Sequence, residues 1–230
     1  MKRILVILHQ RRSRPRRVGR ALRERGYELD IRRPCDGESL PETMDDHAAA
    51  VIFGGPLGVY DCDAHPHLRT ELDWIPVALA SGKPFFGICL GCQMLAHALG
   101  GRVWRHPEGR HEIGYFPIVP AEKSGALFDR PFHAFQWHRD GFEMPSGAVL
   151  LARGEIFENQ AFRYGANAYG VQFHPEITPA TMVRWATFAQ EKKLRDARPV
   201  AEILAKKEEY EPDVRRWLHR FFDHWLGEGV

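Results

Sequence analysis

Residues 83–99 of the chain are KPFFGICLGCQMLAHAL, with Cys89 standing between Gly87 and Gly91. The apolar residues before the cysteine predict a buried strand, and those after it recur at helical spacing. Glycines on both sides permit a turn too tight for side chains, so the thiol is displayed at the bend, as in the G-x-S-x-G nucleophile elbow. At the start of a helix the dipole and unpaired N–H groups favour a thiolate, and the N–H of Leu90 can face a developing oxyanion.

A polar triplet, His174-Pro175-Glu176, follows the apolar segment 168–173 (AYGVQF), which predicts a short buried strand. Packing gives no reason for polar residues at this point, and Pro175 restricts the backbone so that His174 and Glu176 can lie close together. A cysteine, a histidine distant in sequence and a carboxylate that orients the imidazole form a Cys-His-Glu triad. The residues therefore predict nucleophilic catalysis by Cys89.

Three motifs resemble, in the same order, the signatures of class I (triad-type) glutamine amidotransferase domains: Gly54-Gly55-Pro56, residues 87–93 and residues 171–176. The resemblance covers roughly residues 1–190. It is closest to the stand-alone, guanylate-synthase-like amidotransferase domains, which residues 112–117 and 136–138 also resemble. The resemblance implies a flavodoxin-like α/β fold and cleavage of the glutamine side-chain amide.

The resemblance also implies a role for each matching residue. The implied catalytic residues are Cys89 as nucleophile, His174 as base and Glu176 as its partner; the oxyanion donors are the N–H groups of Gly55 and Leu90; the substrate contacts are Gly54, Gln93 and His138. His138 is the weakest of these, because Arg139 follows it where the family loop has glycine. The reaction passes through a γ-glutamyl thioester, and no metal or organic cofactor is expected.

Other functions remain open at this point. The same triad would serve a γ-glutamyl peptidase or hydrolase, in which the leaving group is an amine rather than ammonia for an acceptor or a synthase partner. Cys89 and Cys92 form a C-x-x-C at a strand-to-helix junction, where a thioredoxin-like redox pair also lies. A redox protein, however, needs neither His174-Pro175-Glu176 nor Gly54-Gly55-Pro56. A binding module that keeps the fold without catalysis is the non-enzymatic alternative.

The composition is that of a soluble enzyme from a reducing compartment. The 230 residues carry a net charge of 32 − 30 = +2, which argues against nucleic acid as a general partner. Four scattered cysteines do not form a disulfide framework, so we expect a cytoplasmic protein. No apolar run reaches the ~18 residues of a membrane span. The apolar run 4–8 is shorter than the ~7–15 residues of a signal-peptide core and predicts the first strand instead.

One stretch departs from this even charge: eight arginines lie between Arg11 and Arg25, with Glu24 as the only acid. A solvated face of the first helix is the simpler interpretation. The alternative is a docking surface for an acidic partner or a phosphate, because the stretch follows the first strand at the carboxyl end of the sheet.

Alternating strand and helix patterns predict an α/β fold with a mostly parallel open sheet covered by helices on both faces. We expect strands over 3–9, 27–32, 48–53 and 83–88, and a helix over 68–79 that Pro76 kinks or splits. Short segments after residue 101, such as 113–119, 133–137 and 160–164, predict added antiparallel strands. We expect an amidotransferase domain over 1–190 and a helical extension over 191–230 packed on it. The expected inward stripe of the helical region is Trp185, Phe188, Leu194, Ile203, Leu204, Trp217, Leu218, Phe221, Phe222 and Trp225.

Overall fold

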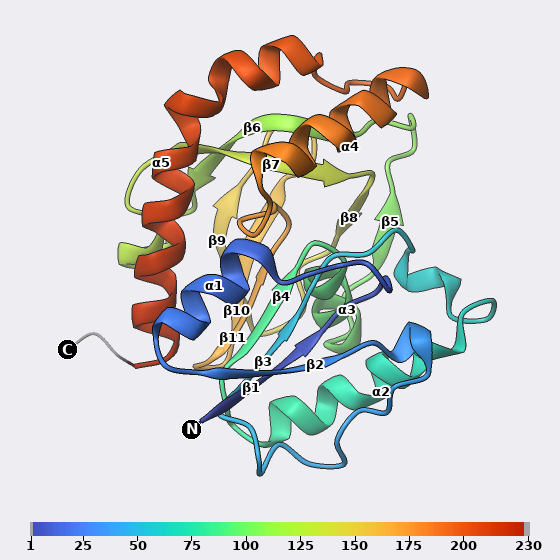
Figure 1. Cartoon of the computed structure of the whole chain (residues 1–230), viewed down its shortest axis with the longest axis vertical. Coiled ribbons are helices and arrows are strands. Elements are labelled where there is room, and N and C mark those ends of the chain that lie inside the picture. Colours follow the sequence, from blue (N-terminus) through green and yellow to red (C-terminus); the bar gives the residue numbers. More distant parts are fainter. Residues whose placement is uncertain (1, 228–230) are drawn as a thin grey trace.

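The computed structural model describes residues 2–227 and contains one large mixed sheet with helices on both faces (Figure 1). The strand order is β2-β1-β3-β4-β11-β10-β9-β6-β7. The strands of this sheet are β1 (Arg3–Ile7), β2 (Glu28–Arg32), β3 (Ala49–Ile52), β4 (Phe85–Ile88), β6 (Glu112–Pro120), β7 (Phe132–His138), β9 (Ala148–Arg153), β10 (Asn159–Tyr164) and β11 (Ala168–Val171). The predicted α/β fold class is confirmed.

The five strands from β2 to β11 run parallel, and the remaining strands extend the sheet in antiparallel pairs. The strands β1, β3 and β4 are buried on both faces, which explains their continuous apolar sequences. In β1, for example, Ile4 and Val6 face one core, while Leu5 and Ile7 face the other. The antiparallel strands include the three segments expected after residue 101. A separate small sheet pairs β5 (Val103–Arg105) with β8 (Asp140–Phe142).

Helices cover the two faces of the sheet in pairs. Helices α1 (Arg16–Glu24) and α5 (Val200–Trp225) pack on one face, and α2 (Pro66–Ala80) and α3 (Leu90–Ala98) pack on the other. Helix α4 (Pro179–Glu191) lies over β6 beside the start of α5. Short 3₁₀ turns occupy Pro34–Asp36, Val59–Asp61 and Gly125–Phe128. No helix of the described residues combines the length and the apolar character needed to cross a membrane.

Two expectations for the helices can be compared with the structure. Helix α2 continues past Pro76, so the expected split does not occur, and the kink at Pro76 stays a prediction. Pro76 lies on its exposed face, where carbonyl groups freed by the proline can bond to water. In the helical region Phe188 and Leu204 are 50% and 44% exposed, so their place in the inward stripe was wrong. A single helical period applied to the whole region takes no account of the break between α4 and α5.

Helix α5 supplies much of one core. Its Trp217, Phe221, Phe222 and Trp225 are buried with the strand residue Phe86 in one aromatic cluster. These contacts support the proposal that residues 191–230 form an extension packed on the 1–190 domain. Residues 228–230 of that extension lie outside the described part of the chain.

Candidate functional site

The turn at Cys89 joins β4 to α3 and has a strained backbone. Cys89 adopts φ +52° and ψ −105°, which a residue with a side chain rarely does. The flanking glycines are required by close backbone contacts: a Cβ on Gly87 would lie 2.4 Å from the Gly91 oxygen, and one on Gly91 would lie 2.1 Å from the Ile52 oxygen. The G-x-C-x-G sequence therefore forms the tight elbow that its glycines predict.

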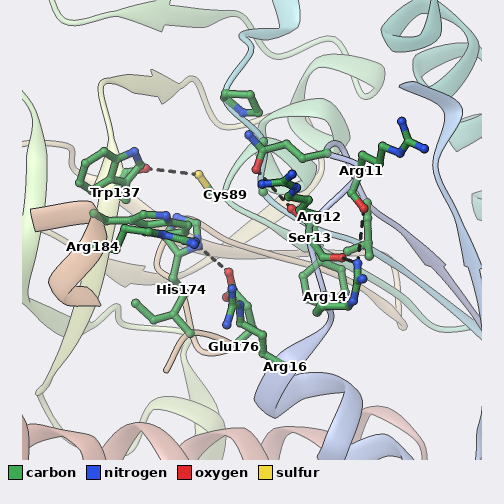
Figure 2. A pocket seen from close by; sticks show the side chains of 18 residues that line it. Arg11, Arg12, Ser13, Arg14, Arg16, Cys89, Trp137, His174, Glu176 and Arg184 are labelled. Carbon is green, nitrogen blue, oxygen red and sulfur yellow. Dashed lines mark hydrogen bonds and ion pairs between the residues drawn. The ribbon is translucent and has the colours of Figure 1, made fainter. Parts of the chain in front are cut away.

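His174 and Glu176 follow β11, the strand that pairs with β4. Nδ1 of His174 lies 2.7 Å from Oε1 of Glu176, and both side chains are buried (Figure 2). The other ring nitrogen, Nε2, has no hydrogen-bond partner among the described residues. This leaves Nε2 free to exchange a proton, while Nδ1 is held by the carboxylate.

The pKa of His174 is raised well above its ordinary value. Burial by itself lowers this pKa, but the negative charge of Glu176 and the interaction with Cys89 outweigh it. The Cys89 sulfur lies 3.8 Å from the Trp137 carbonyl oxygen, to which the thiol is directed (Figure 2). Cys89 and His174 thus interact without a formed hydrogen bond.

Gly54 and Gly55 bring backbone directly against these side chains. A Cβ at Gly54 would lie 3.0 Å from Cε1 of His174 and 3.3 Å from Cβ of Cys89. A Cβ at Gly55 would lie 2.9 Å from Cδ2 of Leu90. The structure therefore brings the predicted oxyanion residues Gly55 and Leu90 together beside Cys89, and their N–H groups as oxyanion donors stay a prediction.

A buried charged pair behind this loop was not singled out from the sequence. Nε2 of His9 lies 2.7 Å from Oε2 of Glu71, and Nδ1 of His9 lies 3.3 Å from the Gly54 oxygen. Burial lowers the pKa of His9, but the charge and hydrogen bond of Glu71 outweigh burial and raise it. His9 thereby supports the Gly54 backbone. The sequence feature that could have identified this pair is His9 itself, a polar residue directly after the apolar run of β1.

Gln93 and His138 lie behind the cavity wall and do not line the cavity beside Cys89. The side-chain amide of Gln93 donates hydrogen bonds to the backbone oxygen of Asp140 and to Oε1 of Gln172. The amide nitrogen of Gln172 in turn lies 3.8 Å from the Cys89 sulfur. Nε2 of His138 lies 2.9 Å from Oε2 of the buried Glu112. Their direct contact with substrate stays a prediction.

Glu112 is the centre of a buried polar network. Its carboxylate accepts hydrogen bonds from the N–H groups of Ile156 and Phe157 and from Gln160, besides contacting His138. Burial raises the pKa of Glu112, but His138 and these hydrogen bonds outweigh burial and lower it. The network connects β6, β7 and β10 and so explains the polar residues in these strands.

Cys92 faces the core rather than the cavity. It is fully buried beneath β11, where a Cβ on Gly170 would lie 2.8 Å from its sulfur. Burial raises the pKa of its thiol well above the ordinary value, which opposes thiolate chemistry. All four cysteines are free. Among the described residues, no group of three or more His, Cys, Asp and Glu side chains is placed to hold a metal ion.

A cavity of about 660 Å³ opens in front of Cys89. It is lined by Leu8, Gln10, Arg11, Arg12, Ser13, Arg14, Arg16, Phe53, Gly54, Gly55, Pro56, Cys89, Trp137, His174, Glu176, Ile177, Arg184 and Trp185. Figure 2 shows Arg184 on the side of Trp137 and His174, and Arg12 and Arg14 on the opposite side. Part of the arginine stretch therefore faces the cavity. Nothing in the sequence indicated that Arg184, a lone basic residue in a helix, would line this cavity.

Comparison with known proteins places this geometry in a family. Residues 12–189 match the family model of glutamine amidotransferase class-I. The glutamine amidotransferase-like protein YfeJ of Salmonella typhimurium is 32% identical over 202 residues, which are 79% of this chain and 81% of that protein. The GMP synthase of Thermosipho africanus is 33% identical over 166 residues, 70% of this chain but 30% of that enzyme. A glutamine amidotransferase structure from Thermotoga maritima superposes with a TM-score of 0.86 at 32% identity, covering 98% of both chains.

Proposed function

The chain belongs to the class I glutamine amidotransferase family, and from this premise we propose that it hydrolyses the side-chain amide of glutamine through a thioester on Cys89. One observation carries the proposal: the strained elbow holds the Cys89 thiol beside an imidazole whose far nitrogen is held by a carboxylate. This combination supplies a nucleophile, a base and an orienting group in one cavity.

In the first step the Cys89 sulfur attacks the amide carbon of glutamine, and the proton that the thiol has given up is held on Nε2 of His174. The carbonyl oxygen becomes an oxyanion that the N–H groups of Gly55 and Leu90 stabilise; loss of one such donor typically costs ~10²–10³ in rate. The carbon–nitrogen bond then breaks, and His174 returns its proton to the departing ammonia. The product on the enzyme is a γ-glutamyl thioester.

In the second step water attacks the thioester carbon while His174 accepts a proton from it. The carbon–sulfur bond breaks, glutamate leaves, and the proton returns to the sulfur of Cys89. Glu176 keeps the imidazole oriented through Nδ1 and stabilises the imidazolium that forms in both steps. No metal or organic cofactor takes part in the proposed sequence.

In this proposal the ammonia released in the first step passes to an acceptor. In relatives named GMP synthase, the segment that matches this chain is 30% of the whole enzyme. Those enzymes are therefore about three times longer than the matching segment. We propose that this chain delivers ammonia to a cytoplasmic acceptor or synthase partner. Neither nucleic acid nor a membrane is part of the proposal.

A second candidate, a γ-glutamyl peptidase or hydrolase, is favoured by the size of the cavity. At about 660 Å³ it lies within the ~300–1,000 Å³ of sites for drug-sized ligands, well above the needs of one amino acid. A larger amine would fit as the leaving group, and the same two steps would apply.

Two measurements test the proposed function. We expect the wild-type protein to release ammonia and glutamate from glutamine and to be labelled on Cys89 by a glutamine-like diazoketone. The C89A variant should show neither activity nor labelling, whereas C35A, the matched control, should keep both. Wild-type turnover by C89A would overturn the assignment.

A further inference from the structure

In the structure, six of the eight arginines of this stretch fall into two groups, while Arg20 and Arg23 are exposed on α1 outside both. Arg17 contacts Glu211 of α5, and Arg25 contacts Asp223 of the same helix. Arg17 in α1 and Arg25 directly after it thus hold α1 and α5 together. By contrast, Arg11, Arg12, Arg14 and Arg16 line the cavity in front of Cys89. Arg11, Arg12 and Arg14 are solvent-exposed and Arg16 is partly buried, and all four lie at the candidate site.

Three of the cavity arginines have no anionic partner in the described chain. Arg12, Arg16 and Arg184 make no ion pair with any described residue, although ion pairs are numerous elsewhere on the surface. Arg11 and Arg14 also line a neighbouring hollow that contains two carboxylates, so the inference does not rest on them. Unpaired guanidinium groups at a cavity are available to a ligand.

The cavity carries an excess of positive charge. Among the described residues Glu176 is the only acid that lines it, and that carboxylate is already bound to His174. Arg12 and Arg16 come from the segment before and at the start of α1, while Arg184 comes from α4. The arginines therefore approach the space in front of Cys89 from two elements distant in sequence, as Figure 2 shows for Arg12 and Arg184.

The backbone holds Arg16 in an unusual conformation. Its φ is +42°, in the left-handed region that disfavours residues with side chains. Such a conformation persists only where the surroundings impose it. The N–H of the next residue, Arg17, donates to the Glu176 oxygen, and Arg17 also donates to the Pro175 oxygen. The arginine segment is therefore fastened directly to the His174-Pro175-Glu176 turn.

We propose that this cavity binds γ-glutamyl amides whose amine part carries carboxylate or phosphate groups. The proposal rests on the thioester chemistry at Cys89. In this proposal the γ-carbonyl lies at Cys89, and the amine part of the substrate extends into the cavity toward the arginines. Guanidinium groups bind carboxylates and phosphates through paired hydrogen bonds, and Trp137 and Trp185 supply an apolar wall for the connecting carbons.

A substrate comparison tests this proposal. We would measure kcat/KM for γ-glutamyl-glutamate, which has two carboxylates on its amine part, and for the neutral γ-glutamyl ethylamide. We expect a preference of about tenfold or more for the anionic compound, which decreases at high salt because ions screen the arginines. γ-Glutamyl phosphoethanolamine, measured in parallel, tells whether phosphate or carboxylate is preferred, and either preference supports the proposal.

Variants connect the preference to particular side chains. R12Q and R184Q should each lower the anionic-to-neutral ratio of kcat/KM by about tenfold, the effect of losing one charge-assisted hydrogen bond. The charge reversal R184E should lower it further. R20Q is the matched control, because Arg20 is an exposed arginine of α1 outside the cavity lining, and its ratio should equal that of the wild type. Thermal unfolding of each variant shows whether it is folded.

The outcomes separate the two proposals. If the diazoketone labels Cys89 and glutamine is hydrolysed, but the wild-type ratio is near one, the anion subsite is overturned and the proposed function stands. If neither labelling nor turnover of any γ-glutamyl compound occurs, the proposed function fails. If glutamine turnover instead rises on addition of an acidic peptide while the ratio stays near one, the arginines bind a protein partner and the substrate proposal is overturned.

Discussion

His174 and Glu176 couple the protonation of one imidazole to the stability of the fold. The raised pKa means that the folded chain holds a proton on His174 more tightly than the unfolded chain, whose value is ~6.5. The resulting stabilisation is fully present below that unfolded value and is lost as the pH rises through the raised folded value.

Replacing Glu176 by Gln removes the charge that raises this pKa. We therefore expect E176Q to be less stable than wild type at pH 5.5, and the difference to shrink by pH 9. Thermal unfolding at both pH values measures it, with E24Q, on the exposed face of α1, as the matched control. An equal loss of stability at both pH values would contradict the role of Glu176.

The buried pair of His9 and Glu71 makes a second prediction for single residues. H9A leaves the Glu71 carboxylate buried without its partner, which typically costs ~3–5 kcal/mol of unfolding free energy. The double variant H9A/E71A should lose less than the sum of the two single variants, because no unpaired charge remains. Urea unfolding measures this coupling, and strictly additive losses would show that the pair is not coupled.

At the scale of elements, the elbow between β4 and α3 depends on backbone contact with β3. Because a Cβ on Gly91 would lie 2.1 Å from the Ile52 oxygen, G91A should destabilise by more than the ~1–3 kcal/mol of ordinary overpacking. G82A is the control, since Gly82 lies just before β4 and has φ +67°, but a Cβ there meets no atom within 4 Å. We expect G82A to lower the unfolding free energy by ~1–2 kcal/mol, from backbone strain alone. Chemical denaturation compares the two, and equal losses would refute the steric explanation.

The elements themselves were largely predictable, because each leaves a local pattern. Apolar runs marked the buried strands, and glycine pairs marked the turns at Gly54 and Cys89. Pro76 does not split α2, because on the exposed side of a helix water can bond to the carbonyl groups that a proline frees. The predicted burial of Phe188 and Leu204 was wrong, because a helical period does not show which side of a helix faces its neighbours.

At the scale of the whole molecule, α5 closes one face of the sheet, and we expect it to unfold together with the rest. W217A should cost ~3–5 kcal/mol, since Trp217 is buried against Phe128, Phe132 and Phe173. L204A, on the same helix but half-exposed, should change stability by ~0.5 kcal/mol or less. A single unfolding transition is expected for both. Separate transitions for α5 and the sheet would contradict the packing of residues 191–230 on the domain.

The sequence by itself determined the fold class, the elbow and the candidate triad, because strands, tight turns and catalytic motifs are encoded in neighbouring residues. Only the tertiary structure decided which arginines pair with α5 and which face Cys89, that Arg184 joins them, and that His9 supports Gly54 from behind. The physical reason is that charge partners and cavity walls come from residues distant in the chain. Local periodicity contains no information about which of these residues meet.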